Sequence, residues 1–114
     1  MSSPAEIAVE RRGANVVARV SGEVDMTNAG YLREQLLDPM PNAALTLVID
    51  ISDCRYLDSA AIEVVFDVSR RLQRRRQELR LVVPESSPLG RVLTLTDVGS
   101  VAPVHATLAS ALAQ

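Results

Sequence analysis

A serine beside an aspartate, at the point where a polar loop meets an apolar helical stretch, is the pair of side chains best placed to do chemistry. The pair is Asp58-Ser59, and the helix that it opens is expected at roughly 60–78. A serine at a helix start is exposed, and its hydroxyl can cap free backbone N–H groups. The same hydroxyl can accept a phosphoryl group, which adds about −1.5 to −2 charges beside the carboxylates of Glu63 and Asp25. Both a structural cap and a phosphorylation site are therefore open readings of Ser59.

The remaining inventory of reactive side chains argues against catalysis. His105 is the only histidine and Cys54 the only cysteine, so no cluster of metal-binding side chains is expected. The chain has no lysine, which excludes the nucleotide-binding motif G-x-x-x-x-G-K-[ST]. The residues around Ser59 also lack the flanking glycines of a nucleophile elbow. We therefore expect no enzymatic activity, no cofactor and no metal ion.

The composition is that of an ordinary globular domain. Hydrophobic residues make up 47% and charged residues 23% of the 114 residues, which excludes disordered and fibrous classes. The net charge of −2 gives no general attraction to nucleic acid, and the five arginines within 70–76 are expected to be solvated. No apolar run approaches the ~20 residues of a membrane span, and the first residues do not resemble a signal peptide. We expect a cytoplasmic protein with a single domain over 1–114 and a core at about 5–113.

The apolar periodicity predicts an α/β fold. Apolar and charged residues alternate at 6–10, a second strand follows at 15–20, and the turn at 12–14 makes the two a hairpin. The strongest strand is 45–51, which is apolar on one face and partly apolar on the other, so it fits a central strand covered on both faces, or on one face by helices. Strand and helix then alternate, which predicts a mixed, mostly parallel sheet with about four helices. The other expected features are a strand end at Gly22, a helix after a cap at Thr27 or Asp25, strands at 79–83 and 101–104, and helices at 89–95 and 106–113.

The helix that follows Ser59 carries more apolar residues than one core face uses. Core packing accounts for Ile62, Val65 and Phe66, which recur at helical spacing. Val64 and Val68 are then left over, and exposed apolar surface beside Ser59 would suit a docking site for another protein.

Two segments together resemble the signature of STAS domains. The first is 48–59, in which an aliphatic strand containing Asp50 runs through a loop to Asp58-Ser59, a small residue and an apolar helix. The second is 21–25, Ser-Gly-Glu-Val-Asp, which is similar to the family's Gly-Glu-aliphatic-Asp just before the first helix. The expected order of elements is also that of the family, so the resemblance extends over nearly the whole chain.

The resemblance implies an anti-sigma factor antagonist, which regulates bacterial transcription by partner switching. In such proteins the serine of the Asp-Ser pair is phosphorylated by the anti-sigma factor's own kinase activity, and a serine phosphatase resets it. Carried over to this chain, that serine is Ser59. The residues expected to bind the partner are Asp25, Asp58, Ser59, Glu63 and Val64.

An alternative remains within the same family. Ala61 stands at the position where the family usually has glycine, and Glu63 adds a negative charge one turn into the helix. Both departures favour a STAS subunit or scaffold that is not phosphorylated, for example in a lipid-transport ABC system.

Overall fold

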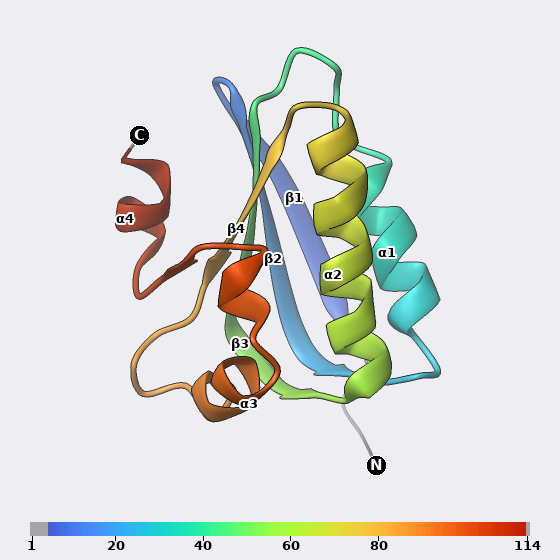
Figure 1. The fold of residues 1–114 in the computed structure, drawn as a ribbon, viewed down its shortest axis with the longest axis vertical. Helices are drawn as coiled ribbons and strands as arrows, with labels where there is room; N and C mark the ends of the chain where they lie inside the picture. Colours follow the sequence, from blue (N-terminus) through green and yellow to red (C-terminus); the bar gives the residue numbers. More distant parts are fainter. Residues whose placement is uncertain (1–4, 114) are drawn as a thin grey trace.

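A computed structural model describes residues 5–113, which form a five-stranded sheet in the order β1-β2-β3-β4-β5 (Figure 1). β1 (Glu6–Arg12) is antiparallel to β2 (Asn15–Val24), as expected of a hairpin. β3 (Thr46–Leu57), β4 (Glu78–Val82) and β5 (Val104–His105) follow, each parallel to its neighbour. The predicted fold class, a mixed and mostly parallel sheet with an N-terminal hairpin, is confirmed.

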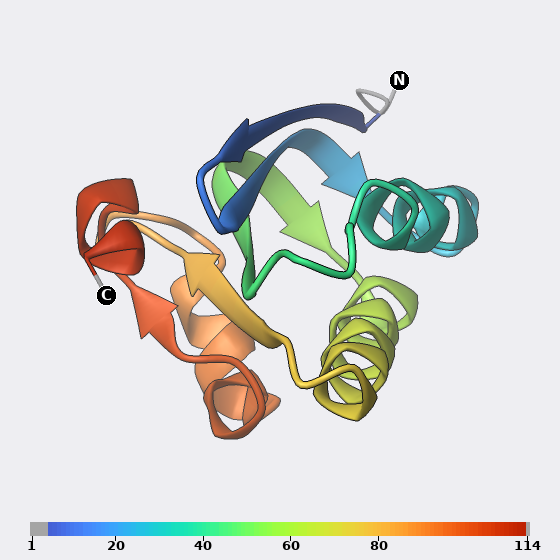
Figure 2. The ribbon, with the colours of Figure 1, turned by 90° about the horizontal axis from the view of Figure 1, so that it is seen from above.

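The helices cover the two faces of the sheet unequally. α1 (Ala29–Leu37), α2 (Ser59–Arg74) and α3 (Gly90–Leu95) lie on one face, and the short 3-10 helix η1 (Val98–Ser100) follows α3. α4 (Leu108–Leu112) lies on the opposite face (Figure 2). α1 and α2 lie side by side and begin at the same end of the sheet, where β2 and β3 finish (Figure 1). None of these helices, within residues 5–113, is long and apolar enough to cross a membrane.

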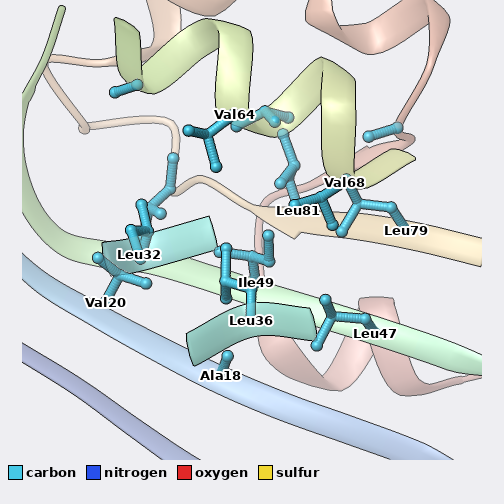
Figure 3. Packing of buried hydrophobic residues seen from close by; sticks show 14 of the residues in the cluster. Ala18, Val20, Leu32, Leu36, Leu47, Ile49, Val64, Val68, Leu79 and Leu81 are labelled. Carbon is cyan, nitrogen blue, oxygen red and sulfur yellow. The ribbon is translucent and has the colours of Figure 1, made fainter. Parts of the chain in front are cut away.

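The core is aliphatic and is divided by the sheet into two clusters. The larger cluster packs alternate strand residues such as Val20, Ile49 and Leu81 against Leu32 of α1 and Val68 of α2 (Figure 3). The smaller one lies under α4 and consists of Val17, Val48, Val82 and Ala111. The three middle strands are therefore covered on both faces and carry apolar residues on both sides, which is one of the two arrangements that the sequence of the third strand left open.

β2 and β3 are both longer than their sequences predicted. β2 continues to Val24 instead of ending before Gly22, and β3 continues from the expected strand to Leu57. The two strands remain paired through register shifts on both sides of Gly22, whose φ of 88° is a conformation that glycine adopts without strain. The glycine therefore marks an irregularity within the strand rather than its end.

α2 is shorter than predicted because the chain reverses at Arg76. Past the last helical residue, Arg74, the N–H of Gln77 donates to the carbonyl of Leu72 at 2.8 Å, and the N–H of Arg76 donates to Gln73 at 3.0 Å. Arg76 has a φ of 58°. This is the Schellman arrangement, in which glycine is the usual residue at the left-handed position.

We expect Arg76→Gly to stabilise the protein by about 0.5 kcal/mol. The left-handed conformation costs an L-residue about 1–2 kcal/mol, and the greater freedom of glycine in the unfolded chain offsets part of that gain. Thermal melts should show a rise of roughly 2–4 °C. Arg74→Gly is the matched control, because it places glycine inside the helix and should lower the melting temperature. A fall for both variants would contradict the account.

Candidate functional site

Asp58 joins the two loops at the end of the sheet where α1 and α2 begin. Its carboxylate accepts hydrogen bonds from the backbone N–H of Ala61 at 3.0 Å and from that of Met26 at 2.9 Å. Its own N–H donates to the carbonyl of Val24 at 3.2 Å. Asp58 is thus the N-cap of α2, and the expectation that Ser59 supplies the cap is wrong. The carboxylate reaches further than a serine hydroxyl and can serve both loops at once.

Ser59 is the first residue of α2 and is exposed. Within residues 5–113, no side-chain hydrogen bond engages its hydroxyl, because Asp58 already serves the free N–H group of Ala61. Ser59 therefore presents an unoccupied hydroxyl at a helix N-terminus, where the helix dipole favours added negative charge.

Asp25 organises the loop that leads into α1. Its carboxylate accepts hydrogen bonds from the backbone N–H of Thr27 at 2.9 Å and from the Thr27 hydroxyl. These bonds to Thr27, led by that of its hydroxyl, hold the pKa of Asp25 below its usual value. The N-cap of α1 is Asn28, without a side-chain capping bond, so the expected cap at Thr27 or Asp25 is wrong. Instead, the Asn28 side chain accepts from the N–H of Asp25 at 2.9 Å and donates to the carbonyl of Glu23 at 3.0 Å.

Of the five side chains expected to bind a partner, the structure leaves four at this end of the molecule. Asp25 and Asp58 belong to loops joined by the Met26–Asp58 hydrogen bond, Ser59 follows Asp58, and Glu63 is exposed one turn further along α2. Val64 is different, because it is only 4% exposed and belongs to the larger core cluster. Val68, expected to be exposed with it, is fully buried. The expectation of a spare apolar stripe is wrong, since α2 packs against α1 as well as against the sheet.

Two exposed side chains near Ser59 were not singled out from the sequence. Met26, whose N–H donates to Asp58, leaves 77% of its surface exposed, and Tyr56, near the end of strand β3, leaves 51% exposed. Large side chains of these types are common at protein interfaces. Met26 lies in the loop between β2 and α1, and Tyr56 pairs with Glu23 beyond the register shifts of β2 and β3, where the residue pattern gives no signal.

A model of the STAS domain family matches residues 6–111, which is nearly the whole chain. The chain belongs to the STAS domain family. Its membership confirms the resemblance seen in the Gly-Glu-Val-Asp and Asp-Ser segments, both of which lie at the shared end of α1 and α2.

Solved structures of anti-sigma factor antagonists show the same fold. The chain is similar to an anti-sigma factor antagonist from Mycobacterium paratuberculosis, with 26% identity and a TM-score of 0.82 over 99% of this chain and 97% of the other. It is also similar to the anti-sigma factor antagonist SpoIIAA in its unphosphorylated form, with 19% identity, a TM-score of 0.72, and 94% and 93% of the two chains covered. For the phosphorylated form of the Bacillus protein SpoIIAA, the identity is 22% and the TM-score is 0.67, over 95% of this chain and 97% of the other. No curated protein matches the sequence.

The alanine at position 61 is compatible with the backbone of this STAS domain. Ala61 lies inside α2 and is fully buried, and its N–H donates the capping hydrogen bond to the carboxylate of Asp58. Within residues 5–113, the residues other than glycine with positive φ are Arg76 and Asp97. Ala61 therefore does not occupy a conformation that requires glycine.

Other potentially reactive groups of the STAS domain lie away from Ser59 or are occupied. Cys54 is buried in β3, where burial raises the pKa of its thiol and makes it a poor nucleophile. The ring Nδ1 of His105 lies 2.9 Å from the hydroxyl of Ser110 in α4, so this histidine does not meet Ser59. The carboxylate of Asp50 accepts from the N–H of Ser52 at 2.9 Å, a local strand contact. Among residues 5–113, no group of three or more His, Cys, Asp or Glu is arranged to hold a metal ion.

Proposed function

We propose that this STAS domain is an anti-sigma factor antagonist that binds an anti-sigma serine kinase in the cytoplasm until Ser59 is phosphorylated. A serine phosphatase restores binding, and the cycle regulates transcription. The domain, over residues 5–113, acts as a binding module without catalysis of its own. The observation that carries the proposal is the exposed Ser59 hydroxyl, which stands at the start of α2 while Asp58 supplies the cap.

Asp58 caps α2 and Ser59 does not, which supports a switch that leaves the fold intact. Phosphorylation of a capping serine would interfere with the helix start, but here the capping bond belongs to Asp58. A phosphate on Ser59 therefore changes the charge of the surface without removing a hydrogen bond that the fold uses. The exposed side chains of Met26, Tyr56 and Glu63 supply the rest of a surface that the partner contacts before phosphorylation.

The alternative, a STAS scaffold that is not phosphorylated, loses part of its support. It rested on Ala61 and Glu63, and the backbone at Ala61 is ordinary helix. Glu63 is exposed and does not contact Ser59 through any hydrogen bond between described residues. We therefore favour the switch.

The test is to capture partners from the native host on wild type, Ser59→Ala and Ser59→Glu. An anti-sigma kinase should be retained by wild type and by Ser59→Ala and largely lost from Ser59→Glu. Mass spectrometry of the tryptic peptide spanning 56–70 should show phosphate on Ser59 and none on Ser69, which is buried and donates to the Val101 carbonyl. Transporter subunits held equally by all three proteins would instead establish the scaffold.

A further inference from the structure

An open groove runs between α1 and α2, beginning next to Ser59. It is separate from the loops around Asp58, although Ala60, the residue after Ser59, lines one end of it. Its lining includes Gly30 and Arg33 from α1 and Ala60, Glu63, Asp67, Arg70 and Arg71 from α2. We refer to this feature as the α1–α2 groove.

No contact within residues 5–113 requires glycine at position 30 in the groove. It lies in the first turn of α1, its φ is not positive, and a Cβ built there would meet no atom within 4 Å. Glycine weakens a helix relative to alanine. The fold therefore does not require glycine at this position, and the missing side chain leaves room for an atom from another molecule.

The end of the groove away from Ser59 carries an excess of positive charge. The carboxylate of Asp67 is shared by three guanidinium groups, those of Arg33 at 3.7 Å, Arg70 at 3.6 Å and Arg71 at 3.1 Å. Each guanidinium has five N–H donors, and these three side chains are 41%, 57% and 52% exposed. One carboxylate cannot satisfy them, whereas the chain as a whole has a net charge of −2.

Arg75 and Arg76 of the same 70–76 run do not share this arrangement. The guanidinium of Arg75 donates to the Met40 carbonyl at 2.9 Å and to the Asn42 side chain at 3.0 Å, so it anchors the loop after α1. Arg76 occupies the left-handed turn beyond α2. The excess of positive charge in the groove is therefore a local cluster. It forms because Arg33 of α1 and Arg70 and Arg71 of α2 all lie against the carboxylate of Asp67.

We propose that the α1–α2 groove receives an acidic segment of the same partner protein that meets Ser59. The proposal rests on the proposed function for the identity of the partner, and on charge complementarity for the segment. Guanidinium groups bind carboxylates through paired hydrogen bonds, which suits an Asp- or Glu-containing segment lying over Arg33 and Arg70. Small residues at Gly30 and Ala60 let the backbone of that segment approach the helices.

The groove and Ser59 make separate contributions to binding. Arg70 lies eleven residues beyond Ser59, which is roughly 16 Å along the helix at about 1.5 Å per residue. Exposed charges this far apart are largely screened at physiological salt, where the Debye length is about 8 Å. A phosphate on Ser59 therefore leaves the groove contact itself almost unchanged. The groove supplies affinity in both states, and Ser59 switches the rest.

The first experiment uses a defined probe, a fluorescein-labelled peptide of repeating Glu-Leu-Glu-Ala, with a Lys-for-Glu peptide as its control. Amide chemical shifts of the full chain should change at Gly30, Ala60 and Arg70 on addition of the acidic peptide only. Gly30→Gln, which fills the groove, and Arg70→Glu should each weaken binding by about fivefold or more. Gly90→Gln and Arg91→Glu are matched controls in α3 and should bind as wild type does. Absence of binding, or shifts confined to other surfaces, would overturn the proposal.

The second experiment separates failure of the groove from failure of the switch. The same variants, with and without Ser59→Glu, are titrated with the anti-sigma kinase retained in the capture experiment. Groove variants should weaken binding by the same factor in both backgrounds. Equal affinities of wild type, Gly30→Gln and Arg70→Glu would refute the groove and leave the switch standing. Weaker binding by the groove variants together with no effect of Ser59→Glu would support the groove and refute the switch.

Discussion

Asp58→Ala should lower the stability of the protein by about 2 kcal/mol, more than any other single change at the exposed end of α2. Loss of an N-cap costs about 1 kcal/mol, and the N–H of Met26 loses its acceptor in the same step, which adds roughly 0.5–1.5 kcal/mol. The melting temperature should fall by roughly 8 °C or more for a domain of this size. Amide hydrogen exchange should quicken at both Met26 and Ala61.

Asp58→Asn separates the two tasks of the carboxylate. Its single side-chain oxygen can still cap Ala61, since asparagine is as good an N-cap as aspartate, but its NH2 group cannot accept from Met26. The variant should therefore retain about half of the lost stability, with faster exchange at Met26 alone. If Asp58→Ala melts within about 1 °C of wild type, Asp58 does not hold the two loops together.

The residue pattern predicted most of the fold because the pattern is strong where the fold is regular. The hairpin follows from alternation around the turn at Gly13, and the central position of β3 follows from a run that is apolar on both faces. The start of α2 follows from a polar loop ending in Asp-Ser before a helical apolar stripe. These features depend on neighbouring residues, so local sequence is sufficient to indicate them.

The sequence was least informative where distant segments decide the outcome. β2 and β3 continue together to Val24 and Leu57 because each supplies the other's partner across an irregular register around Gly22. Tertiary pairing there overrides the usual meaning of a glycine. The end of α2 was missed for a related reason, since Arg76 takes the left-handed position at which the expected signal is a glycine.

The sequence indicated where the candidate site lies, but it did not indicate which side chains hold the site together. The sequence placed Asp25, Asp58 and Ser59 at helix starts, and the topology brings both starts to one end of the sheet. It could not show that the Asp58 carboxylate spans both loops, because the contact with Met26 joins residues 32 positions apart. Val64 was expected at the surface because the sequence of α2 alone does not show that α1 covers a second face of this helix.

Ser59→Glu should weaken binding to the anti-sigma kinase by about tenfold or more while leaving the melting temperature unchanged. One carboxylate has about half the charge of a phosphate and fewer acceptor oxygens, so phosphorylated protein should lose more, about a hundredfold, which corresponds to ~2.7 kcal/mol. The helix N-terminus accommodates the added charge, and Asp58 continues to cap α2 in every variant. The affinity is measured by titration calorimetry and the stability by thermal melts on the same preparations.

Ser59→Ala is the control that distinguishes a regulatory serine from a structural one. A capping serine replaced by alanine costs about 1 kcal/mol, but the cap of α2 is Asp58, so the stability of Ser59→Ala should stay within about 0.5 kcal/mol of wild type. Its affinity should match that of the unmodified protein, because alanine preserves a small, uncharged surface. Ser59→Ala and Ser59→Glu then share one melting temperature and differ in affinity, a separation that a purely structural role cannot produce. Equal affinities for all three forms would remove the switch and leave the STAS domain as a fixed scaffold.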